Sequence, residues 1–235
     1  MDNNTQQFYS QSYGYQAESL GRYTSKTFGW MFAGLLITFL TAFFGYATRT
    51  ILYVFTIPYA YLILAAAELA VVIYLSARIV KMSVGTARLL FFLYSILNGV
   101  VFSALFLVYA TADLILIFGA TSLFFGIMAI LGYTTNADFS RIRPFMTAGL
   151  IFLIAFWILS IFINLQQFET IVCTIGIFLF LVLTAYDTQK IRAYHAYYSN
   201  QPEMAAKASI FSALQLYLDF INLFLYLLRF VGKKN

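Results

Sequence analysis

The stretch ASIFSALQLYLDFINLFLYLLRF, residues 208–230, decides how this chain folds. Its polar side chains recur at steps of three or four residues, so in a helix they stack along one face. They are Ser212, Gln215, Asp219, Asn222, Tyr226 and Arg229. An ionised carboxylate in mid-helix costs about 2.5–3.5 kcal/mol on insertion scales when it faces lipid. We therefore expect the stripe to face protein or water, with this helix as the axis of the molecule.

The composition is that of an integral membrane protein. Of the 235 residues, 62% are apolar and only 10% are charged, and the mean hydropathy is +0.83. A soluble domain carries about 25% charged residues. The net charge of +5 is typical of basic loops that follow the positive-inside rule, so it does not indicate a nucleic-acid partner. Cys173 is the single cysteine, which excludes an intramolecular disulfide.

Seven apolar runs have about the twenty residues that a helix needs to cross the hydrocarbon core. They cover residues 28–47, 57–77, 89–110, 114–133, 144–164, 168–186 and 210–230. The last run either spans fully or re-enters, and the absence of Gly and Pro within it favours a full span. The sequence thus predicts an all-α integral membrane protein with one transmembrane domain, residues 27–235.

The remaining segments predict the orientation. Residues 1–26 are polar and lack the pattern of a signal peptide, so we expect a flexible cytoplasmic tail. The only long connection is 187–207, expected to be an inner loop. With a cytoplasmic N-terminus, ten of the fourteen basic residues lie inside. These are Arg22, Lys26, Arg78, Lys81, Arg88, Arg141, Arg143, Lys190, Arg192 and Lys207.

Catalysis is not expected. The only histidine, His195, lies outside the predicted spans, so an intramembrane serine nucleophile would have no histidine base. No metal-ligand cluster, Walker loop or dinucleotide fingerprint is present. None of the seven runs contains a lysine for a Schiff base. We predict a protein that is not an enzyme and has no cofactor.

Ionisable residues inside or beside the spans are the candidates for function. Glu68 and Asp219 lie within runs, while Asp187 and Arg78 lie at run ends, where they are equally consistent with marking the water interface. Asp219 could instead make a structural hydrogen bond. Glu68 follows three alanines that allow close packing, so it could bond to a neighbouring helix such as the one carrying Asn98.

Carboxylates combined with amide oxygens suit a hard cation such as calcium. Two carboxylates in a poorly solvated site cannot both ionise at low cost, so a close pair shares a proton and responds to pH. The sequence therefore favours ion or proton handling, or a role as a membrane partner. Candidates for the ion path are Glu68, Asn98, Gln215 and Asn222.

Two segments resemble a known family: TAYDTQKI at 184–191 and ALQLYLDFINLFLYLLRF at 213–230. They are similar to the Bax inhibitor-1 family, the transmembrane Bax inhibitor motif proteins, in a bacterial version, and the likeness extends over about residues 20–230. The resemblance implies six helices around a central seventh and a pH-sensitive calcium leak. It also implies that Asp187 and Asp219 form the proton sensor and the transient calcium contact, with Arg78 as an arginine latch.

The predicted spans conflict with this pairing. They place Asp187 at the inner edge of the membrane and Asp219 near its midplane, which at 1.5 Å per residue separates them in depth by roughly 15 Å. The pair can meet only if the last helix is wrapped by protein and shifted toward the cytoplasm. We expect that arrangement.

Three functions stay open at this stage. The first is a proton-gated calcium leak in the bacterial inner membrane, with calcium and protons as its ligands. The second is a regulator without transport that binds a membrane protease or another membrane complex through its polar tail and inner loop. The third is a calcium/proton antiporter, which would require uphill calcium movement driven by a proton gradient.

Overall fold

The structure, a computed structural model, describes residues 18–232, and these residues form helices without any strand in that range. Seven helical segments are long and apolar enough to cross a membrane, which confirms the predicted all-α class and number of spans. Their helices are α2 (Leu20–Ala47), α4 (Ala60–Arg78), α5 (Val84–Ser103) continued by α6 (Leu105–Val108), α7 (Thr111–Thr134), α8 (Arg143–Phe162), α9 (Glu169–Tyr198) and α10 (Pro202–Val231).

The connections are short. Helix α3 (Thr50–Thr56) joins α2 to α4, and the short 3-10 helices η1 (Phe139–Ile142) and η2 (Gln166–Phe168) precede α8 and α9. Local signals fix several starts: Ser83 caps α5 by accepting from the backbone N–H of Thr86 at 3.1 Å. Proline lies in the first turn of α8 and of α10, where its missing N–H costs nothing.

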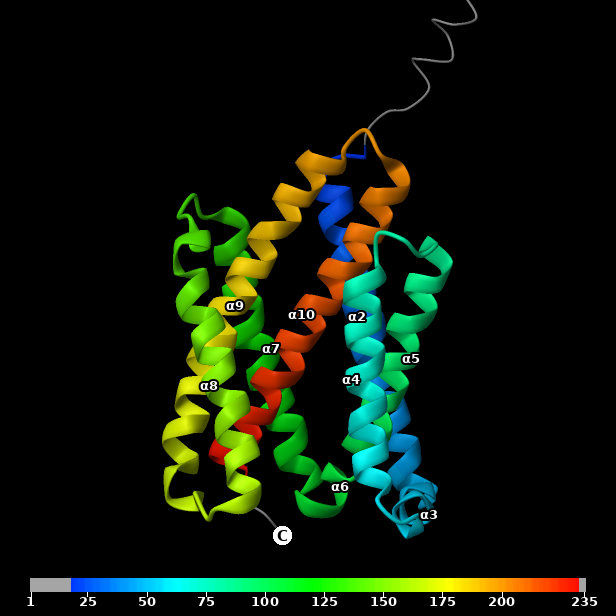
Figure 1. The fold of residues 1–235 in the computed structure, drawn as a ribbon, viewed down its shortest axis with the longest axis vertical. Helices are drawn as coiled ribbons and strands as arrows, with labels where there is room; N and C mark the ends of the chain where they lie inside the picture. Colours follow the sequence, from blue (N-terminus) through cyan, green and yellow to red (C-terminus); the bar gives the residue numbers. More distant parts are fainter. Residues whose placement is uncertain (1–17, 233–235) are drawn as a thin grey trace, which may run out of the picture.

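Helix α10 is the most buried of the seven. Inside its apolar window 72% of residues are buried, against 11–39% in the other six spans. It runs obliquely through the middle of the bundle (Figure 1) and packs mainly against α2, α5, α7 and α9. Helix α4 packs on α5, and α8 packs on α9. This packing is compatible with the predicted central position of the last helix.

The prediction of a long inner loop at 187–207 is wrong. Helix α9 continues to Tyr198 and α10 already begins at Pro202, so a tight turn joins two long helices. The segment is polar in sequence, yet the two helices pack on each other and bury side chains such as Ile191 and Ala208. The hypothesis of a regulator that binds a partner through this inner loop therefore loses the loop as support.

The start of the first span also differs from the prediction. Residues 20–26, expected in the polar tail, form the first turns of α2 behind an N-cap at Ser19. His195, expected in a loop, lies in α9, and its Nε2 donates to the carbonyl oxygen of Glu18 at 2.6 Å. The earlier part of the predicted tail, residues 1–17, lies outside the described residues.

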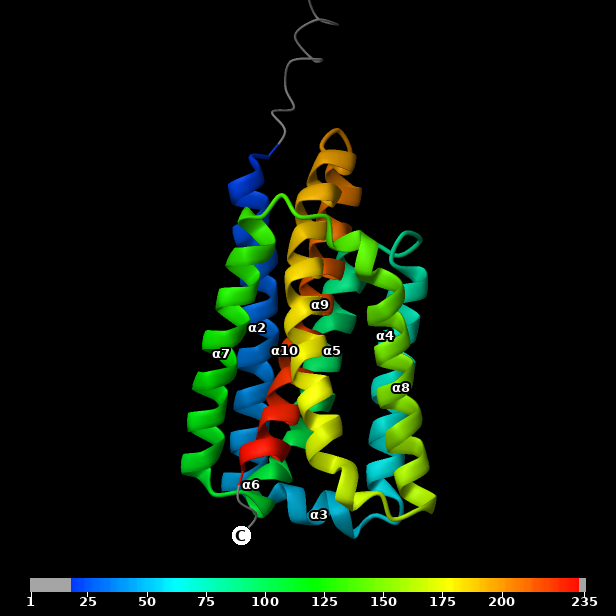
Figure 2. The ribbon, with the colours of Figure 1, turned by 90° about the vertical axis from the view of Figure 1, so that its left-hand side faces the viewer.

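The two ends of the bundle differ. The start of α2, the α4–α5 and α7–α8 connections and the α9–α10 turn lie at one end, which we call the turn end (Figure 1). Helix α3 lies across the opposite end, the α3 end (Figure 2). The ten basic residues expected on the inner side lie in these connections or in the helix segments that lead to them. That this end faces the cytoplasm stays a prediction.

Candidate functional site

The polar stripe of α10 faces protein along most of its length. Ser212, Asp219 and Tyr226 are buried, Gln215 and Asn222 are half-buried, and Arg229 is exposed near the end of the helix. Asn222 donates to the carbonyl oxygen of Leu218 at 2.8 Å, within its own helix. The stripe therefore meets the expectation that Asp219 does not face lipid.

Asp187 of α9 and Asp219 of α10 come together. Their residues are only 6% and 5% exposed, and the two carboxyl groups are near enough to influence each other electrostatically. The conflict in depth disappears because Asp187 does not end its helix: α9 extends beyond it to Tyr198 and packs along α10 (Figure 1). Asp187 and Asp219 are thus neighbours across the α9–α10 contact, and their role as a proton-sharing pair stays a prediction.

Lys190 is the cation of this site, and sequence reasoning missed it. Its Nζ donates to Oδ1 of Asp187 at 2.8 Å. The same ammonium group lies 4.8 Å from the centre of the Tyr186 ring. The signal was present in TAYDTQKI, since residues three apart on a helix share a face. We had interpreted Lys190 only as a loop charge that sets orientation.

The charges in the site do not balance when both acids are ionised. Lys190 supplies one positive charge for two carboxylates, and Oδ2 of Asp219 is buried without a hydrogen-bond partner. Burying an uncompensated charge is costly, whereas a protonated carboxyl group is neutral and can donate a hydrogen bond. The arrangement is therefore suited to two carboxyl groups that hold one proton between them.

Helix α7 fixes the position of the Asp187 segment. A side chain at Gly132 would bring its Cβ into the backbone carbonyl of Ala185, so α7 and α9 touch backbone to backbone there. Arg192 donates to the carbonyl oxygen of Tyr133 at 3.0 Å, and Gln189 donates to that of Ala137 at 2.7 Å. These contacts hold α9 on both sides of Asp187 in sequence.

The predicted latch, Arg78, does not lie at the pair. It is the exposed last residue of α4 and takes part in no ion pair within residues 18–232. Its role as a latch stays a prediction, and in this structure Lys190 holds the position next to Asp187.

Glu68 and Asn98 belong to a second polar cluster, between α4, α5, α2 and α10. No hydrogen bond joins these two residues in the described chain: Asn98 instead donates to the hydroxyl of Tyr94 at 3.1 Å. Oε1 of Glu68 and Oδ1 of Asn98 are both buried without a partner. The Tyr217 ring packs edge-on against that of Tyr94, at 5.7 Å between centres.

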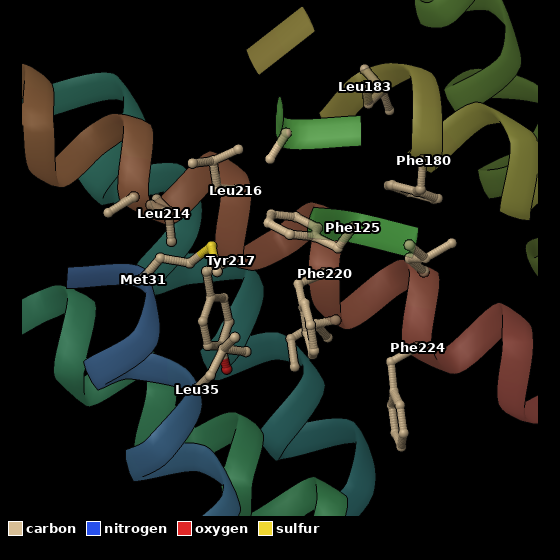
Figure 3. Packing of buried hydrophobic residues seen from close by; sticks show 14 of the residues in the cluster. Met31, Leu35, Phe125, Phe180, Leu183, Leu214, Leu216, Tyr217, Phe220 and Phe224 are labelled. Carbon is tan, nitrogen blue, oxygen red and sulfur yellow. The ribbon is translucent and has the colours of Figure 1, made fainter. Parts of the chain in front are cut away.

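Apolar side chains pack beside the aspartate pair on α10. Phe220, the neighbour of Asp219, packs against Phe125 at 5.5 Å between ring centres, and Figure 3 shows Phe180 and Leu183 of α9 nearby. Of the two cavities that we describe, one lies at the turn end and the other at the α3 end, and neither is lined by Asp187 or Asp219.

The residues available to a metal ion are few. Within the described residues no group of three or more His, Cys, Asp or Glu side chains could hold an ion together. Calcium takes six to eight oxygen ligands. Two carboxyl groups supply only part of that shell, so they suit a passing ion better than a resident one.

Comparison with known proteins places these features in a family. The profile of the family described as "Inhibitor of apoptosis-promoting Bax1" matches residues 20–235. The chain is 37% identical over 218 residues to "Inner membrane protein YbhL" of Escherichia coli K12, covering 92% of this chain and 93% of that protein. Proteins of Rickettsia prowazekii and Borreliella burgdorferi are 35% and 34% identical over similar shares, 91–93% of each chain.

Proposed function

The chain belongs to the Bax inhibitor-1 family, and on that premise we propose that it is a pH-sensitive calcium leak gated by protonation of Asp187 and Asp219. It is a multi-pass membrane protein, and the name of its E. coli relative favours the bacterial inner membrane. The observation that carries the proposal is the buried contact between these two carboxyl groups beside a single cation, Lys190. A site with one positive and two acidic groups changes its net charge when one proton leaves.

The gate follows from that change in charge. With one proton on the pair, Lys190 neutralises the remaining carboxylate. When the proton leaves, one negative charge in the buried site lacks a counter-ion, and a second cation is attracted. Arg78 is the protein's own candidate for that cation, and its arrival from the end of α4 would latch the bundle. Deprotonation thus favours the closed form, and protonation releases it.

Calcium would pass along oxygen atoms of the bundle. Within α10, Gln215 and Asn222 precede and follow Asp219 by one turn on the polar stripe. Glu68 and Asn98 carry further oxygen atoms that have no hydrogen-bond partner. Oxygen ligands of mixed charge suit a hard divalent cation better than a transition metal. Opening requires that the apolar side chains beside Asp219 move apart.

The proposal is tested by calcium entry into liposomes that contain the purified protein and a calcium dye, between about pH 6 and pH 8. We expect the wild type to conduct more calcium at the acid end, and Asp219→Asn to lose this dependence because the variant has no proton to release there. Asp138→Asn is the matched control, since Asp138 is exposed and lies between α7 and η1.

Unchanged flux and unchanged pH response in Asp219→Asn would contradict the proposal. The same liposomes separate a leak from an antiporter. With equal calcium on both sides and a pH gradient imposed, an antiporter accumulates calcium, whereas a leak does not.

A further inference from the structure

A largely apolar groove lies at the α3 end, far from the aspartate pair. It has a volume of about 430 Å³ and is lined by the last turns of α2, by α3 and by α5. Pockets for small ligands typically measure about 300–1,000 Å³. The edge residues Leu40 and Phe44 are 41% and 58% exposed, so the groove opens on the side of the bundle that faces lipid.

Three of the four hydroxyl groups in the lining, those of Thr48, Thr50 and Ser103, make hydrogen bonds within the protein. Thr48 donates to the carbonyl oxygen of Phe44 at 2.6 Å and lies 2.7 Å from the hydroxyl of Thr50. Ser103 donates to the carbonyl oxygen of Val100 at 2.5 Å. Since these groups have bonded within the protein, an occupant of the groove finds mainly methyl and methylene surface. The lining therefore selects an apolar chain rather than a polar solute.

The level of the groove in the membrane follows from α3. This helix lies crosswise to the spans (Figure 2), as helices at a membrane interface do. Tyrosines in α3 and just after it are exposed: Tyr53 of α3 at 74%, and Tyr59 and Tyr61 at 71% and 62%. Exposed tyrosines gather where headgroups meet acyl chains. The groove thus lies where the first carbons of an acyl chain run beneath a lipid headgroup.

Arg49 supplies a charge at the same level. It sits between the lining residues Thr48 and Thr50, in a left-handed turn with φ of 57°. Its side chain is exposed and forms no ion pair within residues 18–232. A guanidinium group binds phosphate oxygens in a two-pronged geometry. A phosphate group beside the mouth of the groove would be an ion-pair partner for Arg49, which has none within residues 18–232.

We propose that the groove is a binding site for one membrane phospholipid, with the start of an acyl chain between α2, α3 and α5 and the phosphate on Arg49. Arg49 is the direct sequence neighbour of the lining residues Thr48 and Thr50. A cation next to an apolar groove matches a phospholipid, in which the phosphate lies next to the acyl chains. The site is independent of the aspartate pair and of any calcium leak. It ties α3 to the spans through a bound lipid.

The experiment uses the full-length protein in lipid nanodiscs containing phosphatidylglycerol with a photoactivatable group on its acyl chain. Cross-linked peptides are then quantified by mass spectrometry. We expect labelling of residues 40–54 and 100–103 above that of 151–162, a stretch of α8 with exposed apolar side chains. Val54→Trp fills the groove and should reduce this labelling to the level of α8. Leu52→Trp is the matched control, because Leu52 is on α3 but does not line the groove.

Arg49→Gln tests the phosphate contact without changing the packing. At limiting lipid we expect labelling to fall about tenfold, as for the loss of a charged hydrogen bond, and Arg49→Lys to retain most of it. Circular dichroism of each variant shows whether the fold is kept. Equal labelling of the groove and α8, or full labelling in both Val54→Trp and Arg49→Gln, would overturn the proposal.

Discussion

Two acids in this bundle, the buried Asp219 and the half-buried Glu68, have opposite surroundings. Asp219 on α10 meets a second carboxyl group, Asp187, and through it the ammonium group of Lys190. Glu68 on α4 has Tyr94 near it but no cation, and its Oε1 atom is buried without a partner. In membrane spans both would be candidates by position alone. The difference lies in what the neighbouring helices bring to each.

This comparison separates a coupled acid from an isolated one. Proton loss from the aspartate pair changes the attraction to Lys190 and to any further cation, so it acts on α9 and α10 together. Proton loss from Glu68 changes one side chain on a helix that is mostly exposed. The gate that we propose therefore lies at the pair, and Glu68 has at most a part in the proposed ion path.

The largest expected effect is on the packing that holds the pair. Gly132→Ala should destabilise the protein by about 3 kcal/mol, because its Cβ would meet backbone atoms of Ala185. Backbone atoms cannot rotate aside as the end of a flexible side chain can. Gly126→Ala on the same helix should be neutral or stabilising, since nothing lies within 4 Å of its Cβ position. Unfolding in detergent, followed by circular dichroism, measures both. Equal stability of the two variants would show that α7 does not fix α9.

Removing the cation comes next. Lys190→Met should cost about 2 kcal/mol, below the 3–5 kcal/mol for a fully buried pair, because the Lys190 side chain is 23% exposed. Adding Asp187→Asn should recover part of this loss, since it removes the unpaired charge. If the double variant is no more stable than Lys190→Met alone, the ion pair does not contribute as described.

A smaller loss of stability is expected in the second polar cluster, the one around Glu68 and Asn98. The hydroxyl groups of Tyr217 and Thr38 lie 2.7 Å apart and both residues are buried. Tyr217→Phe removes this hydrogen bond and should cost about 1 kcal/mol in the same unfolding assay. Tyr74→Phe is a control, because Tyr74 is 54% exposed on α4. A loss as large as that of Lys190→Met would weaken the contrast between the two clusters.

Glu68→Gln should change stability by less than about 0.5 kcal/mol, because no ion pair is broken and the shape is kept. The result is measured in detergent at neutral pH beside Lys190→Met. A loss above that of Tyr217→Phe would mean that Glu68 has a partner and that the two acids are alike.

The smallest effect concerns Asp138, between α7 and η1. Hydrogen bonds from the Ser140 side chain and backbone hold the pKa of Asp138 below its ordinary value. A lowered pKa contributes stability above the unfolded pKa of about 4 and loses it as pH falls through the folded value. Asp138→Asn should therefore leave the pH response near neutrality intact. A change in that response would move the sensor away from the pair.

Much of the fold could be predicted from the sequence, because apolar runs of span length are a strong signal. The polar stripe of α10 also indicated correctly that Asp219 faces protein. The sequence did not predict that α9 and α10 continue through residues 187–207, since the polarity of this segment is equally typical of a loop. What keeps that segment helical is the mutual burial of the two helices, which no single segment reveals.

Within the site, Asp187 and Asp219 were proposed as a pair on the family resemblance, whereas the contact of Lys190 with Asp187 was found only in the structure. A lysine at the end of a span can set the orientation of the protein or form an ion pair, and only the fold shows which of the two it does. A bond from Glu68 to the helix that carries Asn98 stays a prediction, since the amide of Asn98 donates to Tyr94 within its own helix. The latch at Arg78 stays a prediction, as it depends on a movement of α4.

The most direct test of the central claim is to count the proton on the pair by infrared spectroscopy of the protonated carboxyl band. Between about pH 6 and pH 8, in a Glu68→Gln background that removes the other acid within a span, we predict a band that decreases as pH rises and is absent when Asp219→Asn or Asp187→Asn is added. The band should persist in Glu68→Gln. A band that is lost in Glu68→Gln, or one that does not change over this pH range, would contradict an aspartate pair that senses pH.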